Sequence, residues 1–177
     1  MFLNPKSSIL NSRGGQVIIE AIVALSVLTI GYLAILALLN KSLAQSTLIS
    51  DQNIAIYLAS EGLEVTRNLI DANKIQGLPF NDNFPIGSYE ISFDTQLDAS
   101  NPGDYIGPPG TLSDIPLLFD VASGRYNYSI GAPTRFYRTI QISQPNVNQL
   151  HAIAIVNWEN KGGGNSEVKL EESFFAP

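Results

Sequence analysis

The sequence has no cysteine and a single histidine, His151. The absence of cysteine excludes disulfides, thiolate metal sites and a cysteine nucleophile. One histidine cannot build a histidine-rich metal cluster, and it disfavours a hydrolase triad. No nucleophile–base pair or glycine-rich phosphate loop is evident either. We therefore expect a protein that is not an enzyme and that binds no cofactor or metal, with His151 in a structural role.

Charge is also scarce, since charged residues make up 15% of the chain against about 25% in a typical soluble protein. Ten basic residues stand against 16 acidic ones, and the net charge is −6. This balance disfavours nucleic acid as a partner. Basic residues do lie among aromatic ones around Arg125, Arg135 and Arg138, and such a pattern can bind single-stranded nucleic acid. The acidic total favours a strand with one polar face instead.

One long apolar run is present, from Val17 to Leu39, and its only charged residue is Glu20. A helix of this length spans roughly 35 Å and can cross the bilayer's hydrocarbon core of about 30 Å. Lys6 and Arg13 precede the run without any acidic residue between them. The positive-inside rule then places the N-terminus in the cytoplasm and the chain after residue 40 outside.

A cleaved secretory signal is the alternative for this run, with Ser42-Leu43-Ala44 as a small-x-small cleavage site. The run is longer than the roughly 7–15 residues of a signal-peptide core. It also carries a carboxylate near its start, which such cores avoid. Both features favour a permanent membrane helix.

The helical period continues beyond the apolar run, because Leu58, Val65 and Leu69 recur at steps of three and four. No proline interrupts residues 16–78. The pattern predicts one helix from about Ser12 to Asn73 that ends before Gly77. Its second half is amphipathic, so we expect these three residues to face the rest of the chain.

The remaining segment, residues 79–177, reads as β-structure, so the fold class is α+β with an antiparallel sheet. Residues 98–116 are rich in Pro, Gly, Asp and Ser and predict a long loop. Asp98, Asp104 and Asp114 in this loop match no calcium-ligand spacing. The last three predicted strands form a meander around a turn at 159–165. The strands are predicted at 89–94, 117–119, near 126–128, and at 136–143, 150–158 and 166–174.

Glu20 is the residue with the strongest functional signal. A carboxylate inside a membrane segment is costly unless it is paired, and is by default a functional candidate. No Lys or Arg lies in the apolar run to pair with it. A cut after Gly15 would create an α-amine at Gln16, and that amine would pair with the Glu20 of a neighbouring copy.

The segment Arg13-Gly14-Gly15-Gln16, with Glu20 and the apolar helix behind it, resembles the type IV pilin superfamily, which includes the pseudopilins of type II secretion. The family's leader is short and basic and ends in Gly, and a Glu occupies the fifth mature position. The run EAIVALSVLTIGYLAILAL is similar to V-type minor pilins and to the I-type pseudopilin. The C-terminal strands, 138–175, resemble the sheet of V-type minor pilins more loosely.

The resemblance implies a structural filament subunit whose partners are the membrane, a prepilin peptidase and other pilin subunits. The peptidase would cut between Gly15 and Gln16 and methylate the amine of Gln16, and Glu20 would set axial register. The mature protein would move from the inner membrane to a surface pilus or pseudopilus. The implied parts are a leader (1–15), a membrane and assembly helix (16–40), its amphipathic continuation (41–76) and a β-rich pilin domain (77–177).

Three departures from the family pattern bear on this expectation. Gln16 stands where a large apolar residue is usual, and an N-terminal glutamine can cyclise. The apolar helix lacks the proline that major pilins often carry, and the chain lacks the cysteines of many pilin domains. The last two features favour a minor subunit. A second hypothesis, a single-pass anchored binding module that never assembles, stays open.

Overall fold

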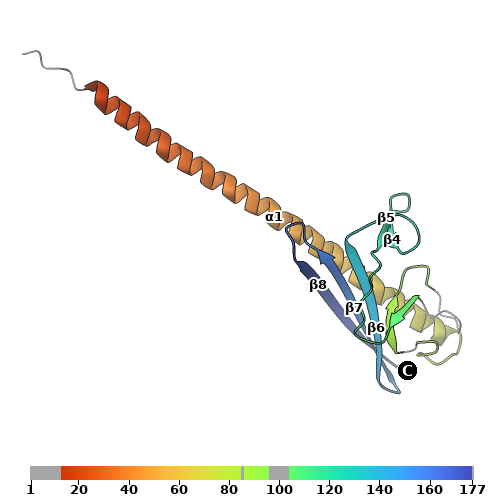
Figure 1. Cartoon of the computed structure of the whole chain (residues 1–177). Helices are drawn as coiled ribbons and strands as arrows, with labels where there is room; N and C mark the ends of the chain where they lie inside the picture. Colours follow the sequence, from red (N-terminus) through yellow and green to blue (C-terminus); the bar gives the residue numbers. More distant parts are fainter. Residues whose placement is uncertain (1–12, 85, 96–103, 177) are drawn as a thin grey trace, which may run out of the picture. The chain divides into compact units, whose positions relative to one another are not determined.

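The computed structural model describes residues 13–84, 86–95 and 104–176, and its fold is α+β. One helix, α1 (Arg13–Ile75), precedes eight strands (Figure 1). The chain divides into two compact units between Thr47 and Leu48, and each is described by itself. The strands are β1 (Gly87–Glu90), β2 (Asp104–Gly107), β3 (Leu118–Asp120), β4 (Arg125–Asn127), β5 (Ala132–Pro133), β6 (Phe136–Asn146), β7 (Gln149–Glu159) and β8 (Asn165–Phe175).

The described part of the first unit is helical throughout. Its large apolar side chains are exposed on every side of the helix, from Val17 to Leu43. Among the described residues, α1 is the one helix long and apolar enough, by length and composition, to cross a membrane. A helix that is apolar all round needs an apolar environment or other helices around it.

In the second unit, the α1 residues from Leu48 to Ile75 pack on the larger sheet. Leu58 is buried as expected, whereas Val65 and Leu69 are only partly buried at the margin of the core. The apolar stripe predicted from Leu58, Val65 and Leu69 therefore lies about one residue away from the centre of the helix face that contacts the sheet. The helix residues at the centre of the contact are Ala55, Leu58, Ala59, Gly62, Leu63, Thr66 and Ile70.

The helix face that contacts the sheet contains small residues, and at Gly62 the sheet approaches the helix closely. A Cβ atom built on Gly62 would lie 2.5 Å from Cδ1 of Ile140 and 3.3 Å from Cδ of Arg138. Both of these β6 residues are fully buried. At Gly62, α1 therefore lies against β6 without room for a side chain.

The helix ends where the sequence predicts, at a glycine. Gly77 has a φ of 72°, and the Leu78 N–H donates to the Asn73 carbonyl at 3.0 Å. A left-handed glycine with this hydrogen bond is the Schellman type of helix end. The turn sends the chain on toward the sheet.

The larger sheet is antiparallel, with the strand order β2-β1-β6-β7-β8. The predicted meander of the last three strands is confirmed, and its second turn contains Gly163 and Gly164 at positive φ. Residues at even positions of β6 and β7, such as Ile140 and Ala154, face α1 in the core. β8 lies at one edge of the sheet.

Two predictions for the first strands were wrong. The strand expected at 89–94 is β1, which ends at Glu90 and is buried at all four positions, so it does not alternate as a half-buried strand does. The loop expected at 98–116 contains β2, which pairs with β1 and places the Tyr105 ring 5.4 Å from the Tyr89 ring. This pairing is non-local, and the loop-like composition hides it.

A smaller antiparallel sheet has the order β4-β3-β5. The Phe119 and Tyr126 rings pack across its first pair of strands at 5.0 Å. After β4, the Asn127 side-chain oxygen accepts hydrogen bonds from the N–H groups of Ser129 and Ile130, at 2.9 and 2.7 Å. An asparagine that bonds the backbone in this way fixes a turn.

Candidate functional site

The residues predicted for processing and assembly all lie on α1, in the first unit. Gly15, Gln16 and Glu20 are helical and exposed. Gln16 and Glu20 are four residues apart and so share one face of the helix, about 6 Å apart along its axis. A Cβ atom on Gly15 would meet nothing within 4 Å, so packing within the described chain does not require glycine there.

The hydroxyl groups in the apolar stretch are satisfied within the helix itself. Ser26 donates to the Ile22 carbonyl and Thr29 to the Leu25 carbonyl, both at 2.7 Å. Such bonds to the preceding turn remove the cost of placing a hydroxyl in an apolar environment. These two side chains therefore need no partner from another chain.

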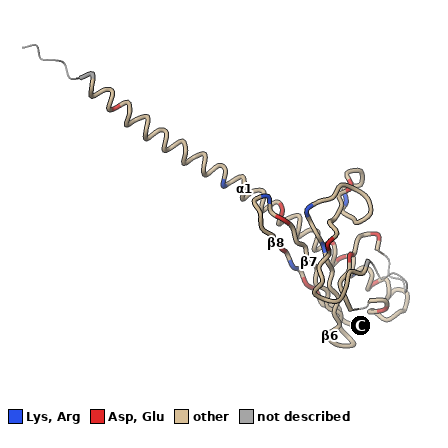
Figure 2. The backbone as a smooth tube through the Cα atoms, in the orientation of Figure 1, with Lys and Arg blue, Asp and Glu red and all other residues tan. Residues whose placement is uncertain are grey.

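Glu20 is different, because an acidic side chain cannot donate to its own helix when ionised. The residues that the structure describes give Glu20 no ion pair and no side-chain hydrogen bond. Figure 2 shows how little charge of either sign the first half of α1 carries. A carboxylate that enters an apolar environment needs a partner, and the described residues provide none for Glu20.

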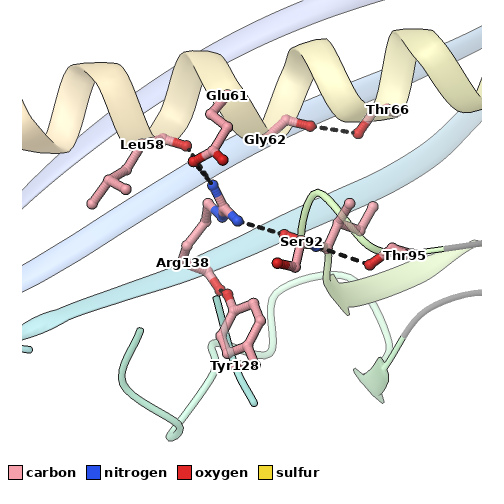
Figure 3. Close-up of polar contacts among 9 residues, drawn as sticks. Leu58, Glu61, Gly62, Thr66, Ser92, Thr95, Tyr128 and Arg138 are labelled. Carbon is pink, nitrogen blue, oxygen red and sulfur yellow. Dashed lines mark hydrogen bonds and ion pairs between the residues drawn. The ribbon is translucent and has the colours of Figure 1, made fainter. Parts of the chain in front are cut away.

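A second polar site lies in the other unit, around Arg138 of β6. Its side chain is fully buried, and its guanidinium reaches α1 on one side and the segment after β1 on the other (Figure 3). Nη1 donates to the Leu58 carbonyl and to Oε2 of Glu61, both at 3.0 Å. Nη2 donates to the Ile91 carbonyl at 2.6 Å. We call Arg138 with these three partners the arginine clamp.

Further polar groups surround the arginine clamp. The Tyr128 hydroxyl donates to the Arg138 carbonyl at 2.9 Å, and Thr66 donates to the Gly62 carbonyl at 2.8 Å. Burial raises the pKa of Tyr128 to about 12, although the positive charge of Arg138 opposes the shift. The Ser113 hydroxyl bonds to the buried carboxylate of Glu90. Thr66, Glu90, Ser113 and Arg138 are buried, and Tyr128 is partly buried. Such a set of mutually bonded groups inside the core suits a structural role.

Two more ion pairs join α1 to the strands of the second unit. Asp51, which is buried, pairs with Arg135 just before β6. Arg67 pairs with Glu172 of β8, and this hydrogen bond raises the pKa of Arg67. Together with the arginine clamp, they fix the helix along the length of the sheet.

The structure corrects the sequence interpretation of Arg138, which was expected on the polar face of a strand. Phe136, Arg138 and Ile140 alternate on the buried face of β6. The two-residue period of the strand was the signal that could have placed it there. The other two basic residues also have partners: Arg135 binds Asp51, and Arg125 lies 5.1 Å from the Phe93 ring.

The loop acidic residues do not form a site within the part of the chain that is described. Asp98 lies outside the described residues, as does the side chain of Asp104, and Asp114 is exposed. No three His, Asp or Glu side chains among the described residues converge as metal ligands. His151 is half-buried on β7, with Nε2 at 3.3 Å from Oε2 of Glu171 on β8.

An open groove of about 330 Å³ lies between α1 and β4 in the second unit. It is mostly apolar, and the carboxylate on its rim, that of Glu61, already pairs with Arg138. The groove therefore offers shape and apolar surface without reactive groups. Its lining residues are Ile54, Tyr57, Leu58, Glu61 and Tyr126.

Comparisons with protein-family models, with curated proteins and with solved structures found no match for this chain.

Proposed function

We propose that this chain is a structural subunit of a type IV pilus or of a type II secretion-like filament, cut by a prepilin peptidase between Gly15 and Gln16. The observation that carries the proposal is Glu20. It is the single charged residue in the exposed apolar stretch from Val17 to Leu39, it has no partner among the described residues, and it lies five positions after the glycine at the proposed cut.

The proposed assembly mechanism follows from the cost of leaving that carboxylate unpaired. In a filament, apolar helices pack side by side, and packing alone sets axial register weakly because a slip of one turn changes few contacts. An ion pair between Glu20 and the terminal amine of a neighbouring subunit penalises the slip, since breaking a buried pair costs about 3–5 kcal/mol. The peptidase would also methylate the amine of Gln16.

The proposed location also follows from the sequence. Lys6 and Arg13 keep the leader in the cytoplasm, and the β-rich second unit is exported. Before assembly the chain is a single-pass protein of the inner membrane, and afterwards part of a pilus or pseudopilus. The lack of a proline in the apolar helix and of cysteine supports a minor subunit.

The N-terminal residue of the mature protein tests this function. The full chain is expressed in cells that carry a prepilin peptidase, extracted from membranes and analysed by intact mass and N-terminal peptide. A chain that begins at residue 16 supports the filament subunit. A chain that keeps Met1 supports the anchored binding module that does not assemble, and a start at Gln45 supports a secreted domain.

A pair of glycine variants makes the test specific for the peptidase. Gly15→Leu places a large side chain before the proposed cut and should abolish processing. Gly31→Leu is the matched control, because Gly31 lies on the same helix and a Cβ atom there also meets nothing within 4 Å. Normal processing of Gly15→Leu would sink the assignment.

A further inference from the structure

The residue that the proposed cut exposes has a side chain that can react with its own amine. Gln16 lies within α1, its side chain is exposed, and no described residue forms a hydrogen bond with its carboxamide. We propose that Gln16 is a modification site, at which the mature N-terminus closes to a pyroglutamyl ring. This inference rests on the proposed cleavage.

The helix prepares this reaction geometrically. Side chains on an α-helix tilt toward the helix N-terminus, and a χ1 of about −60°, one of the two rotamers common in helices, places the Gln16 side chain gauche to its own backbone nitrogen, from where a five-membered ring can close. In the uncut chain that nitrogen belongs to the peptide bond with Gly15 and cannot react. After the cut it is a primary amine at the first position of the helix, where the backbone nitrogens lack intrahelical acceptors.

The reaction is balanced without any co-reactant. The neutral α-amine nitrogen attacks Cδ of Gln16, and a C–N bond forms that closes a five-membered lactam. The Cδ–Nε2 bond breaks, and the side-chain nitrogen leaves as ammonia with the proton that the attacking amine gives up. Nothing is oxidised or reduced.

The surroundings of Gln16 favour the uncharged product. The positive pole of a helix lies at its N-terminus and disfavours a positive charge there. Val17, Ile18 and Ile19 follow at once and are all exposed, so the new terminus adjoins apolar surface that is destined for lipid or for other helices. A charged ammonium is costly in such surroundings, and the lactam removes it.

Cyclisation removes the terminal cation with which this chain could otherwise pair with a neighbouring subunit. The chain keeps the carboxylate of Glu20 but has no terminal cation to give to the Glu20 of another copy. A filament made of this chain alone would then leave every Glu20 unpaired. The cation for Glu20 must come from a subunit whose first residue cannot cyclise, so this chain is an insert among other subunits and does not form a homopolymer.

The test measures the N-terminus of the processed full-length chain. Membranes from cells with the peptidase are treated with an amine-acylating reagent at lysis, before any heating, so that free amines are trapped. We expect the N-terminal peptide to lack one ammonia and to carry no acyl group, with or without a methyl group. An intact Gln16 that is acylated or methylated, without loss of ammonia, would overturn the inference and leave the proposed cleavage standing.

Gln16→Met is the matched variant, because methionine has a similar length and no carboxamide. Its N-terminus should be acylated or methylated in full, whereas the wild type stays blocked. Equal acylation of the two chains counts against cyclisation. A peptide that still contains Gly15 shows instead that the cut does not occur, and the proposed function then fails together with this inference.

Discussion

Nη1 of Arg138 lies 3.0 Å from Oε2 of Glu61, and this ion pair joins β6 to α1 inside the core of the second unit. The same guanidinium binds two backbone carbonyls, those of Leu58 and Ile91. Removal of this buried guanidinium would leave the two carbonyls without their donor inside the core, whereas the Glu61 side chain is 34% exposed and can reach water.

The second unit should fold without the apolar half of the helix, because it contains the whole core. A fragment of residues 41–177 removes the exposed apolar stretch from Val17 to Leu39. We expect it to be soluble and monomeric, with both helix and sheet in its circular dichroism spectrum. A purely helical or disordered spectrum contradicts this expectation.

Arg138→Met should destabilise that fragment by about 1–3 kcal/mol for each buried carbonyl that loses its donor, whereas the Glu61 carboxylate is 34% exposed and can be solvated. The variant leaves the Glu61 carboxylate and two carbonyls without their donor. Urea unfolding measures the change. Lys169→Met is the control, because Lys169 pairs with Glu167 on the surface and should cost no more than about 1 kcal/mol. A similar small effect at Arg138 means that the arginine clamp contributes little.

Gly62→Val should destabilise the fragment by about 1–3 kcal/mol, because overpacking forces a buried core to shift. The new side chain would meet Ile140 and Arg138, which are both fully buried. Thermal unfolding measures the change. Gly162→Val is the control in the turn before β8, where a Cβ atom meets nothing within 4 Å. If the two variants unfold alike, the close approach at Gly62 is not restrictive.

Alkaline pH should weaken the second unit through Tyr128. Its pKa is raised from 10.0 to about 12 in the folded state, so folding holds the phenolic proton more tightly than the unfolded chain does. The resulting stability is complete below pH 10.0 and is lost as the pH rises toward about 12. Burial raises the pKa of Tyr89 to about 12 as well, so phenolate absorbance should show two tyrosines ionising late. Tyr128→Phe should reduce that late step by one phenol. Tyr57→Phe, at a side chain that is 75% exposed, is the matched control.

Glu20→Gln should leave membrane insertion and processing unchanged but reduce the protein recovered in sheared filaments several-fold. The variant keeps the size of the side chain and removes the charge that we propose sets axial register, and breaking such a buried pair costs about 3–5 kcal/mol. Glu64→Gln makes the same change at an exposed position of the same helix and should have no effect. Equal recovery of Glu20→Gln and wild type would mean that the ion-pair mechanism does not apply to this subunit.

Sequence patterns correctly predicted the elements that depend mainly on residues close to one another in the chain. The long helix follows from an apolar period without proline, and its end follows from Gly77. The meander of β6 to β8 follows from three alternating runs with short links. The signals for these elements lie within the elements themselves or directly beside them, and the structure has them nearly where they were expected.

The elements that depend on distant residues were missed. β2 forms because β1 lies beside it, and its own composition is that of a loop. The arginine clamp forms because Leu58, Glu61 and Ile91 converge on Arg138 from two other segments. A charged residue in a strand looks like a surface residue until those partners are known. The roles of Gly15, Gln16 and Glu20 concern other molecules, and so remain predictions.

β8 gives the sheet a free edge of 11 residues, and such an edge invites another strand to pair with it. Its exposed side chains alternate in sign, as Glu167, Lys169 and Glu171. Charged side chains on an edge strand discourage edge-to-edge pairing. If the chain is a membrane-held subunit, as we propose, it is crowded in two dimensions before assembly, and these charges would keep its sheet edge from pairing with that of a neighbour.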